Sequence, residues 1–464
     1  MQFHGRVSEL KLLREQRDAK RSGFVPVYGR RRVGKSELII KFMGGNGIYF
    51  VGKQAPGNAQ IREFLEVSAR ALNEPLIAGA NVSGWKDALS LVVGRWDHKR
   101  RGRLVLALDE FQWMAEASTE LQSVLQELWD RDWSKSGGIL LILCGSYIGF
   151  MEREVLGRKS PLFGRRTAQI HLQPFNHLES AAFHPGYSCS DLARTYGICG
   201  GVPLYLEAWN AHQSVEQNIT RLFLEETSIL AREPEFLLRE ELRALTTYHA
   251  VLMEMAAGYT MSSDIAKRTG VDPRVLNYHL GVLCNLGYVA KHYPVSGKRH
   301  AALHVRYHLD DPVLRFWFRF VFPNQSLIRA LGPQKAFADI VRPHLDSWFG
   351  DCFERLCRGC LPLIYAREGV AGRFTIGQYW DPKVQIDVVG LRDDGWIDLG
   401  ECKWGDVSPA KAVAELEKKA ALFPNPSNAT IGRRLFLKSV SARQKEKLPI
   451  NTKIHELADL YKLA

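Results

Sequence analysis

A glycine-rich loop between an apolar strand and an apolar helix is the feature that most constrains the fold of this chain. The loop, Gly29-Arg30-Arg31-Arg32-Val33-Gly34-Lys35-Ser36, has the spacing GxxxxGKS and follows the apolar run Phe24–Tyr28. The glycines let backbone N–H groups wrap phosphate oxygens, and the start of the next helix adds positive potential. The loop therefore predicts an ATP site on a parallel α/β sheet, in which Lys35 reaches the β- and γ-phosphates and Ser36 ligates magnesium.

A second apolar run ends in two acids and supplies the other half of such a site. Residues 104–108, LVLAL, are typical of a strand that is buried on both faces of a parallel sheet, and Asp109 and Glu110 follow it. Asp109 is expected to hold the magnesium ion through water. Glu110 is expected to activate the attacking water as a general base.

The middle of the chain, residues 243–310, changes to short helices followed by alternating strands. The apolar positions Leu276, Leu280, Leu283 and Leu286 recur at helical spacing, which predicts a core stripe. Segments 287–291 and 302–309 alternate like the strands of a hairpin. Two helices and a hairpin in this order predict a winged helix.

Two interpretations of this winged helix are open. It could bind DNA through exposed residues of its second helix and through the basic tip of its hairpin. The candidates for these contacts are Arg274, Asn277, Tyr278, Lys298 and Arg299. Alternatively, it could pack on the nucleotide domain and report its state.

Acids near the C-terminus occur in an order that is typical of a nuclease. Glu354 lies in a helical segment, Asp387 lies in one apolar strand, and Glu401 lies in the next, two residues before Lys403. Residues i and i+2 of a strand point the same way, so Glu401 and Lys403 are expected to face one site while Cys402 points into the core. Acids at strand ends are usually only solvated, but this order of four residues resembles the PD-(D/E)XK nucleases.

That resemblance implies a metal-dependent phosphodiesterase site. Asp387 and Glu401 would hold a magnesium ion, with manganese possible, and Glu354 would complete its ligands. Lys403 would orient the attacking water and offset phosphate charge. The candidate catalytic residues of the C-terminal domain are therefore Asp387, Glu401 and Lys403.

Short motifs along the chain resemble those of the archaeal ATPase family, on the AAA+/STAND side of the P-loop NTPases. They are, in order, FHGRVSEL, YGRRRVGKSEL, ALDEFQW, CGSYIGFM, SPLFGRR and GGVPLYL, and the C-terminal QIDVVG and GECKW resemble the domain of unknown function 234. The resemblance implies that Ser146 senses the γ-phosphate and that Arg165 or Arg166 acts as an arginine finger. It also implies that Phe3, Gly5 and Arg6 lie near the adenine, and that residues 201–203 couple the nucleotide to the lid.

At 464 residues the chain is too long for one ordinary core, and we expect an α/β multi-domain protein. The expected parts are a P-loop ATPase core (1–175), a helical lid (176–242), a winged helix (243–310), a linker (311–335) and a PD-(D/E)XK nuclease-like domain (336–464). No run is long and apolar enough for a membrane span, and the N-terminus lacks the apolar core of a secretion signal. We therefore expect a soluble, cytoplasmic protein.

The formal charge of +12 modestly favours DNA as a partner. Arginine fingers commonly act across subunits, so a homo-oligomer is expected. The first hypothesis is an ATP-controlled, metal-dependent DNA nuclease. The alternative is a STAND-like switch with a protein or nucleic-acid trigger, whose nuclease-like domain is inactive or needs a partner. A transcription regulator is a third hypothesis, but it leaves the Glu-x-Lys strand unexplained.

Overall fold

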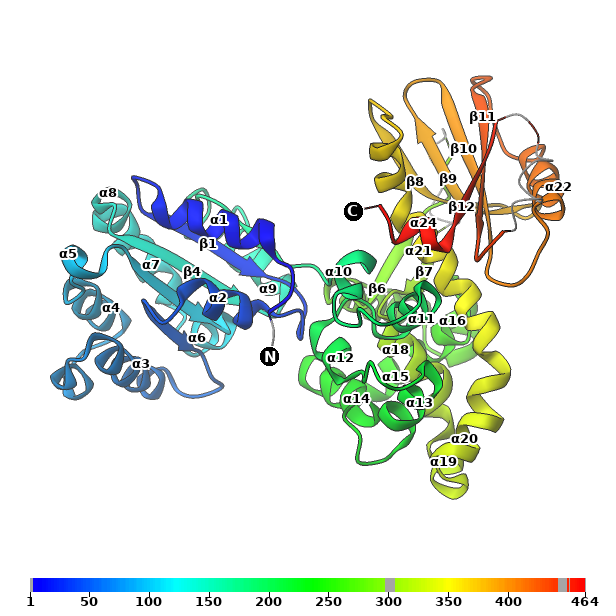
Figure 1. Cartoon of the computed structure of the whole chain (residues 1–464). Helices are drawn as coiled ribbons and strands as arrows, with labels where there is room; N and C mark the ends of the chain where they lie inside the picture. The colour runs from blue at the N-terminus through cyan, green and yellow to red at the C-terminus, as the bar shows by residue number, and fades with distance from the viewer. Residues whose placement is uncertain (1–2, 297–304, 441–448, 450, 464) are drawn as a thin grey trace. The chain divides into compact units, whose positions relative to one another are not determined.

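The chain folds into two compact units, residues 1–174 and 175–464 (Figure 1). The structure is a computed structural model, and it describes residues 3–296, 305–440, 449 and 451–463. The first unit contains the predicted parallel sheet, and the second contains a separate α/β sheet. The predicted fold class, an α/β multi-domain protein, is therefore confirmed. The finer division into five parts stays a prediction.

The first unit is built on a five-stranded parallel sheet of order β2-β3-β4-β1-β5. Its strands are β1 (Gly23–Tyr28), β2 (Ile48–Val51), β3 (Leu104–Asp109), β4 (Ile139–Gly145) and β5 (Ile170–His171). Every residue of β1, β3 and β4 is buried, as the continuous apolar runs predict. Because the strands are parallel, the carboxyl ends of β1 and β3 lie at the same edge of the sheet.

Alternating residues of these strands enter two separate cores. Leu104, Leu106 and Leu108 of β3 pack with helices on one face of the sheet, whereas Val105 and Ala107 pack with α1 and α2 on the other. The main helices of the unit are α1 (Val7–Asp18), α2 (Lys35–Met43), α3 (Gly57–Leu72), α4 (Trp85–Gly94), α6 (Phe111–Ala117) and α7 (Leu121–Leu128). The sheet is therefore covered on both faces.

The second unit begins with short helices, and residues 243–310 contain further helices followed by antiparallel strands. The first helices are α10 (His177–Ala181), α11 (Cys189–Cys199), α12 (Pro203–Ala208), α13 (Val215–Ile219) and α14 (Ile229–Glu241). They are followed by α15 (Leu245–Ala256), α16 (Ser262–Thr269), α17 (Pro273–Asn285) and the antiparallel strands β6 (Val289–His292) and β7 (Arg306–Leu309). Gly270 ends α16 at φ 68°, and the Asp272 side chain caps α17. Lys298 and Arg299 lie outside the described residues.

The segment predicted as a linker, residues 311–335, is helical and largely apolar at its start. It contains α18 (Pro312–Phe316), α19 (Gln325–Leu331) and the first residues of α20 (Pro333–Ala336). Phe316 and Trp317 are completely buried in the main core of the unit. This stretch differs from an extended linker because its aromatic side chains join the core that surrounds them.

A five-stranded mixed sheet of order β12-β11-β10-β9-β8 forms the C-terminal part. β8 (Phe374–Trp380), β9 (Gln385–Arg392) and β10 (Trp396–Lys403) are antiparallel, and β11 (Thr430–Leu437) and β12 (Thr452–Glu456) continue in parallel. Helix α21 (Leu345–Arg367) packs on one face, α22 (Pro409–Ala420) packs on the other, and α24 (Leu457–Leu460) closes the chain. The 23 residues of α21 link this sheet to the helical part of the unit.

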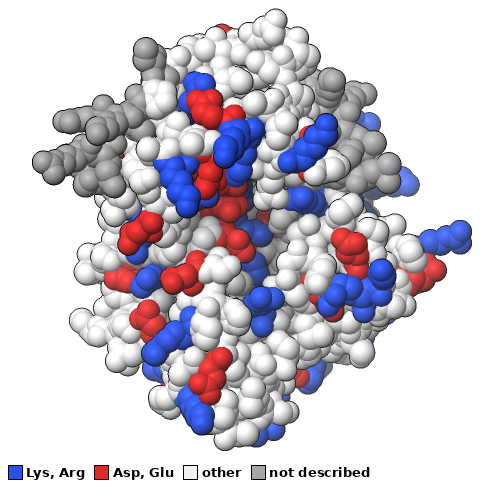
Figure 2. Space-filling view, turned by 90° about the vertical axis from the view of Figure 1, so that its right-hand side faces the viewer, with Lys and Arg blue, Asp and Glu red and all other residues white. Residues whose placement is uncertain are grey.

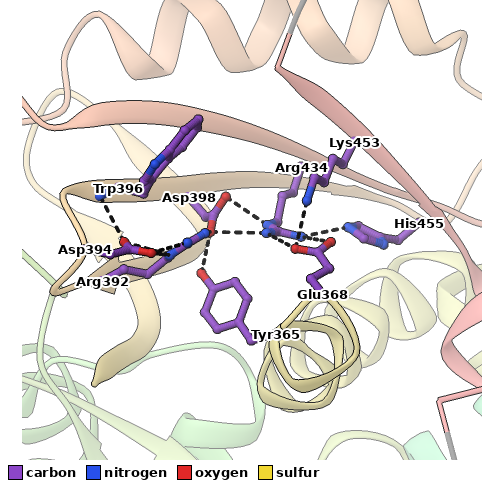
Figure 3. A network of polar contacts seen from close by, with 9 residues as sticks. All are labelled: Tyr365, Glu368, Arg392, Asp394, Trp396, Asp398, Arg434, Lys453 and His455. Atoms are coloured by element: carbon purple, nitrogen blue, oxygen red, sulfur yellow. Dashed lines mark hydrogen bonds and ion pairs between the residues drawn. The ribbon is translucent and has the colours of Figure 1, made fainter. Parts of the chain in front are cut away.

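A buried ion-pair cluster connects the end of α21 to strands β9, β10, β11 and β12 (Figure 3). Arg434 on β11 is 1% exposed, and its guanidinium lies 2.9 Å from Asp398 Oδ1 and 2.8 Å from Glu368 Oε2. Tyr365 donates a hydrogen bond to Asp398 Oδ2 at 2.6 Å. Burial alone would raise the pKa of Glu368, but hydrogen bonds from Arg434 and Lys453 lower it to about 2. The cluster therefore stays charged and fixes the end of α21.

Arg434→Met should lower the free energy of unfolding by about 3 kcal/mol. The buried carboxylate of Asp398 would lose its nearest cation and be left with Tyr365 and, at 3.4 Å, Arg392. Urea unfolding of the full chain measures this difference. The matched control is Arg239→Ala, which removes an exposed ion pair with Glu235 and should cost less than about 1 kcal/mol. Equal effects of the two substitutions would contradict the structural role of the cluster.

Candidate active sites

The glycine-rich loop leaves the end of β1 and leads into α2. A Cβ atom at Gly29, whose φ is 154°, would lie 2.2 Å from the carbonyl oxygen of Leu172. Gly34 has a φ of 88° directly before the helix begins at Lys35. Both positions therefore need glycine, and the loop follows a strand and precedes a helix as the motif requires.

Two basic side chains brace this loop from within. Lys35 Nζ donates hydrogen bonds of 2.8 Å to the carbonyl oxygens of Gly29 and Arg30. Arg6 is buried, and its guanidinium donates to the carbonyl oxygen of Val33 at 2.9 Å. Burial lowers the pKa of Lys35, and the charges of Asp109 and Glu110 oppose this shift. Arg6 thus supports the loop backbone. The sequence predicted only that Arg6 lies near the adenine, and it did not indicate this contact with the loop.

Asp109, at the carboxyl end of β3, lies next to the loop. Ser36 Oγ donates to Asp109 Oδ2 at 2.6 Å, and the Tyr49 hydroxyl donates to the same oxygen at 2.5 Å. A hydroxyl and a carboxylate oxygen so close together suit a magnesium ion, which prefers oxygen ligands. Ser36 and Asp109 would hold the ion, and it would neutralise charge on the phosphates. Tyr49 was not predicted, because its distance from Asp109 along the chain hides the contact.

Glu110 is held by two polar side chains at the same edge of the sheet. Ser146 Oγ donates to Glu110 Oε1 at 2.7 Å, and Gln112 Nε2 donates to Oε2. The backbone at Glu110 is left-handed, with a φ of 48°, directly before α6 begins at Phe111. Ser146 meets Glu110 through its hydroxyl. Gln112 stands two residues after Glu110 in ALDEFQW, but its contact with Glu110 was not predicted from the sequence.

The two candidate arginine fingers have different surroundings. Arg165 forms a bidentate ion pair with Asp130, at 2.6 and 2.8 Å, and donates to the carbonyl oxygen of Pro161. Arg166 is exposed, and its charge lowers the pKa of Tyr28 at the end of β1, against a larger rise from burial. A guanidinium bound to Asp130 would have to break that pair before it could reach a phosphate.

The C-terminal acids meet where β9 and β10 leave their regular pairing. Asp387 Oδ2 accepts a hydrogen bond of 3.0 Å from the backbone N–H of Cys402. Asp387 and Glu401 are 7% and 1% exposed, respectively. The Cys402 side chain packs in the core with α21, while Glu401 and Lys403 point to the other side of the strand.

Lysines occupy both oxygens of Glu401. Lys403 Nζ lies 2.9 Å from Glu401 Oε1 and 2.8 Å from Glu415, and Lys419 Nζ lies 2.6 Å from Glu401 Oε2. Burial alone would lower the pKa of Lys403, but the hydrogen bonds to the two glutamates raise it. Lys419 comes from α22, and no sequence spacing indicated that it would reach Glu401.

Glu354 approaches the same acids from α21. Burial, and next the charge of Asp387, raise the pKa of Glu354 to about 7. Burial, and next the charge of Glu401, raise the pKa of Asp387. Arg358, one turn beyond Glu354, donates to the carbonyl oxygen of Asp387 at 2.8 Å and lies 3.7 Å from Glu354. The structure thus brings the three predicted acids into mutual electrostatic range.

These acids do not form a finished metal site. In the described part of the chain, no three His, Cys, Asp or Glu side chains are arranged so that they could hold a metal ion. The donor set of three carboxylates fits magnesium or manganese by its chemistry. However, Glu401 would have to give up a lysine contact to join such a set. The predicted metal role of Glu354, Asp387 and Glu401 therefore remains a proposal.

Comparisons with known proteins assign the two ends of the chain. Residues 3–209 match the family model of the ATPase domain that occurs predominantly in Archaea. An archaeal-type ATPase domain therefore forms the first part of the chain. Residues 317–415 match the domain of unknown function 234, described as "Archaea bacterial proteins of unknown function". The P-loop, Asp109 and Glu110 all lie within the stretch that matches the ATPase domain, and the C-terminal match gives no activity.

Three individual proteins are similar to this chain over most of their own length. An uncharacterized protein of Methanocaldococcus jannaschii is 27% identical over 435 residues, which cover 90% of this ATPase and 92% of that protein. The match with the Walker-type ATPase of Pyrococcus abyssi covers 68% of this chain and 96% of that protein, at 17% identity and a TM-score of 0.51. The Aeropyrum pernix ORC2 protein covers 70% and 95%, at 16% identity and a TM-score of 0.41. The Pyrococcus abyssi protein shows a shared fold.

No helix in the described part of this ATPase combines the length and the apolar character that a membrane span needs.

Glu110→Gln should lower the rate of ATP hydrolysis at least about 100-fold while nucleotide binding persists, because the amide keeps the contacts but cannot take a proton. Steady-state phosphate release and nucleotide binding measure the two effects. Glu116→Gln makes the same change at an exposed position of α6 and should leave both unchanged. Wild-type turnover by Glu110→Gln would exclude Glu110 as the base.

Glu354 should make stability depend on pH. Its pKa in the folded chain, about 7, lies above the ordinary glutamate value of 4.5. The contribution of Glu354 to stability is therefore full below about pH 4.5 and is lost as the pH rises through 7. The Tm of wild type relative to Glu354→Gln should therefore fall between pH 5 and pH 8 in the presence of a chelator. Glu116→Gln serves as the exposed control, and a constant Tm difference would contradict the raised pKa.

Proposed function

We propose that ATP binding and hydrolysis in the first unit control the metal-dependent cleavage of DNA phosphodiester bonds by the C-terminal domain. The observation that carries this proposal is the cluster of Glu354, Asp387 and Glu401, two of them almost fully buried. Like charges that raise one another's pKa cost stability, and such clusters concentrate at functional sites. A purely structural domain gains nothing from this repulsion.

The residues around the cluster have the chemistry that cleavage requires. A divalent cation bound to the three carboxylates would lower the pKa of a bound water and stabilise the leaving oxygen. Lys403, at 2.9 Å from Glu401, would orient the water and offset phosphate charge. Glu354, with a pKa of about 7, could accept or donate a proton near neutral pH.

DNA is the proposed substrate. Arg274, Asn277 and Tyr278 are all exposed on α17, the helix that a winged helix would place against DNA. The net charge of +12 favours the same partner. An arginine finger that acts between subunits would make the protein a homo-oligomer, and Arg166 suits this role better than Arg165, which Asp130 holds.

A second candidate function is a STAND-like, ATP-dependent switch whose nuclease-like domain is inactive until a partner binds. The ion pairs of Glu401 with both Lys403 and Lys419 favour it, because they occupy the oxygens that a metal would need. In this interpretation a protein or nucleic-acid trigger would rearrange α22 and release Glu401. Slow ATP turnover without cleavage by the isolated protein would then be expected.

Cleavage of labelled linear, branched and single-stranded DNA with magnesium or manganese, with and without ATP, tests the proposal. Asp387→Asn should reduce the rate at least about 100-fold, because it removes a carboxylate from the site and keeps its size. Asp346→Asn makes the same change at an exposed position of α21 and should cut like wild type. Lys35→Ala shows whether ATP controls the reaction.

Two outcomes separate the candidates. If wild type hydrolyses ATP and cuts none of the substrates with either metal, the nuclease proposal fails for the isolated chain and the switch is favoured. If Asp387→Asn cuts as fast as wild type, the cleavage comes from another site or from a contaminant.

A further inference from the structure

A cleft rich in arginine lies within the second unit beside Glu354. It has a volume of about 530 Å³ and is bordered by the end of α15, by β7 and by α21. We call it the arginine cleft; its charged lining consists of Arg306, Arg315, Arg319, Arg355 and Arg358 against Asp351 and Glu354. Figure 2 shows one face of the molecule, on which acidic side chains gather in a hollow with basic side chains beside them.

Arg315 is the most unusual member of this cleft. It is 8% exposed, and within the described residues no carboxylate lies at ion-pair distance from it and its Nε has no hydrogen-bond partner. Its guanidinium instead donates to Cys352 Sγ at 3.0 Å and stacks on Trp348, 4.5 Å from the ring centre. A guanidinium keeps its charge, and a buried charge without a counterion is costly. This residue therefore indicates an anionic ligand in the cleft.

The other arginines leave the cleft positive. Arg355 pairs with Asp310 at 2.7 Å, and Arg358 is shared between Glu354 and the carbonyl oxygen of Asp387. Arg319 is exposed, and among the described residues its side chain makes one long hydrogen bond, of 3.5 Å, to the carbonyl oxygen of Ala257. Each guanidinium has five donors, so these contacts use only part of their capacity.

The pKa of a histidine in the lining of the cleft is lowered by burial and by the arginine charges around it. Burial, and next the charge of Arg355, lower the pKa of His308 to about 2, so this imidazole is neutral at physiological pH. It accepts or donates hydrogen bonds without adding charge. The positive charge of the cleft therefore comes from its arginines, whose planar guanidinium groups match the geometry of phosphate oxygens.

We propose that the arginine cleft binds the phosphates of a single DNA strand and leads that strand to Glu354. A volume of about 530 Å³ falls in the range of small-ligand pockets, so it suits a few atoms of one backbone rather than a duplex. The strand would enter past Arg319, which is exposed, and reach Arg315 and Arg358. Binding itself does not rest on the proposed function; only the fate of the strand at Glu354 does.

Fluorescence anisotropy of a labelled single-stranded oligonucleotide, with the full chain in a chelator, tests the proposal. Arg319→Ala should weaken binding about five- to tenfold and reduce the slope of log affinity against log salt by about 0.7. Arg315→Met should weaken binding at least as much. The matched control, Arg239→Ala, removes an exposed arginine from α14 and should bind like wild type.

Arg315 is buried, so its variant is used only if its Tm is close to that of wild type; Arg319→Ala, at an exposed position, keeps the test decisive in either case. Wild-type affinity and salt slope in Arg319→Ala would overturn the proposal. If the chain bound duplex DNA more tightly than a single strand, and Arg274→Ala rather than the cleft variants abolished that binding, the DNA site would lie on α17 and the proposal would be overturned. Unlabelled AMP could also displace the labelled oligonucleotide at the same concentration as unlabelled oligonucleotide does. That result would overturn the proposal in favour of a free nucleotide as the ligand of the cleft.

The chelator separates this inference from the proposed nuclease, because no cleavage takes place during the measurement. If the cleft variants bind poorly but wild type cuts nothing with magnesium or manganese, the cleft stands and the nuclease proposal fails. If wild type cuts DNA while both cleft variants bind and cut normally, the nuclease stands and the cleft proposal fails.

Discussion

The burial of helix α21 on several sides is the constraint on which the second unit depends. Near its start, Cys352 packs against Gly197, where an added Cβ would lie 2.9 Å from the sulfur. One turn on, Arg355 reaches Asp310, next to the end of β7, and at its far end Tyr365 reaches Asp398. Because the same helix contacts the helical part, the hairpin and the sheet, the position of each fixes the position of the others. Glu354 lies between these anchors, which is why a carboxylate can be held in a costly environment.

The carboxylates of the two candidate sites have different kinds of neighbours. In the ATPase domain, Asp109 accepts hydrogen bonds from Ser36 and Tyr49, and Glu110 accepts them from Ser146. Each of these acids therefore has its own neutral donors. In the C-terminal domain the acids instead face one another, with cations only at part of the cluster. The arrangement in the ATPase domain suits a nucleotide that brings its own metal ion. In the C-terminal domain, the negative charge of the acids is only partly balanced by the cations of the protein.

The ATPase half of the chain could be predicted in detail because its determinants are local. The loop from Gly29 to Ser36 and the acids after β3 are continuous stretches, and parallel pairing brings strand ends to one edge. The partners of these residues could not be predicted, because Tyr49 and Gln112 reach the acids through tertiary contacts. The burial of the aromatic residues after residue 311 could not be predicted either, since an aromatic cluster in a connecting segment gives no sign of the core that will bury it.

The sequence by itself determined the order of the elements, the residues that need glycine, and the alternation that separates Glu401 from Cys402, because these follow from backbone geometry and side-chain periodicity. Only the tertiary structure decided which charges meet. Lys419 of α22 reaches Glu401 on β10, and Arg315 is buried without a carboxylate partner among the described residues. Such contacts join distant segments, and their energies depend on burial and on distances of a few ångströms, which no spacing along the chain records.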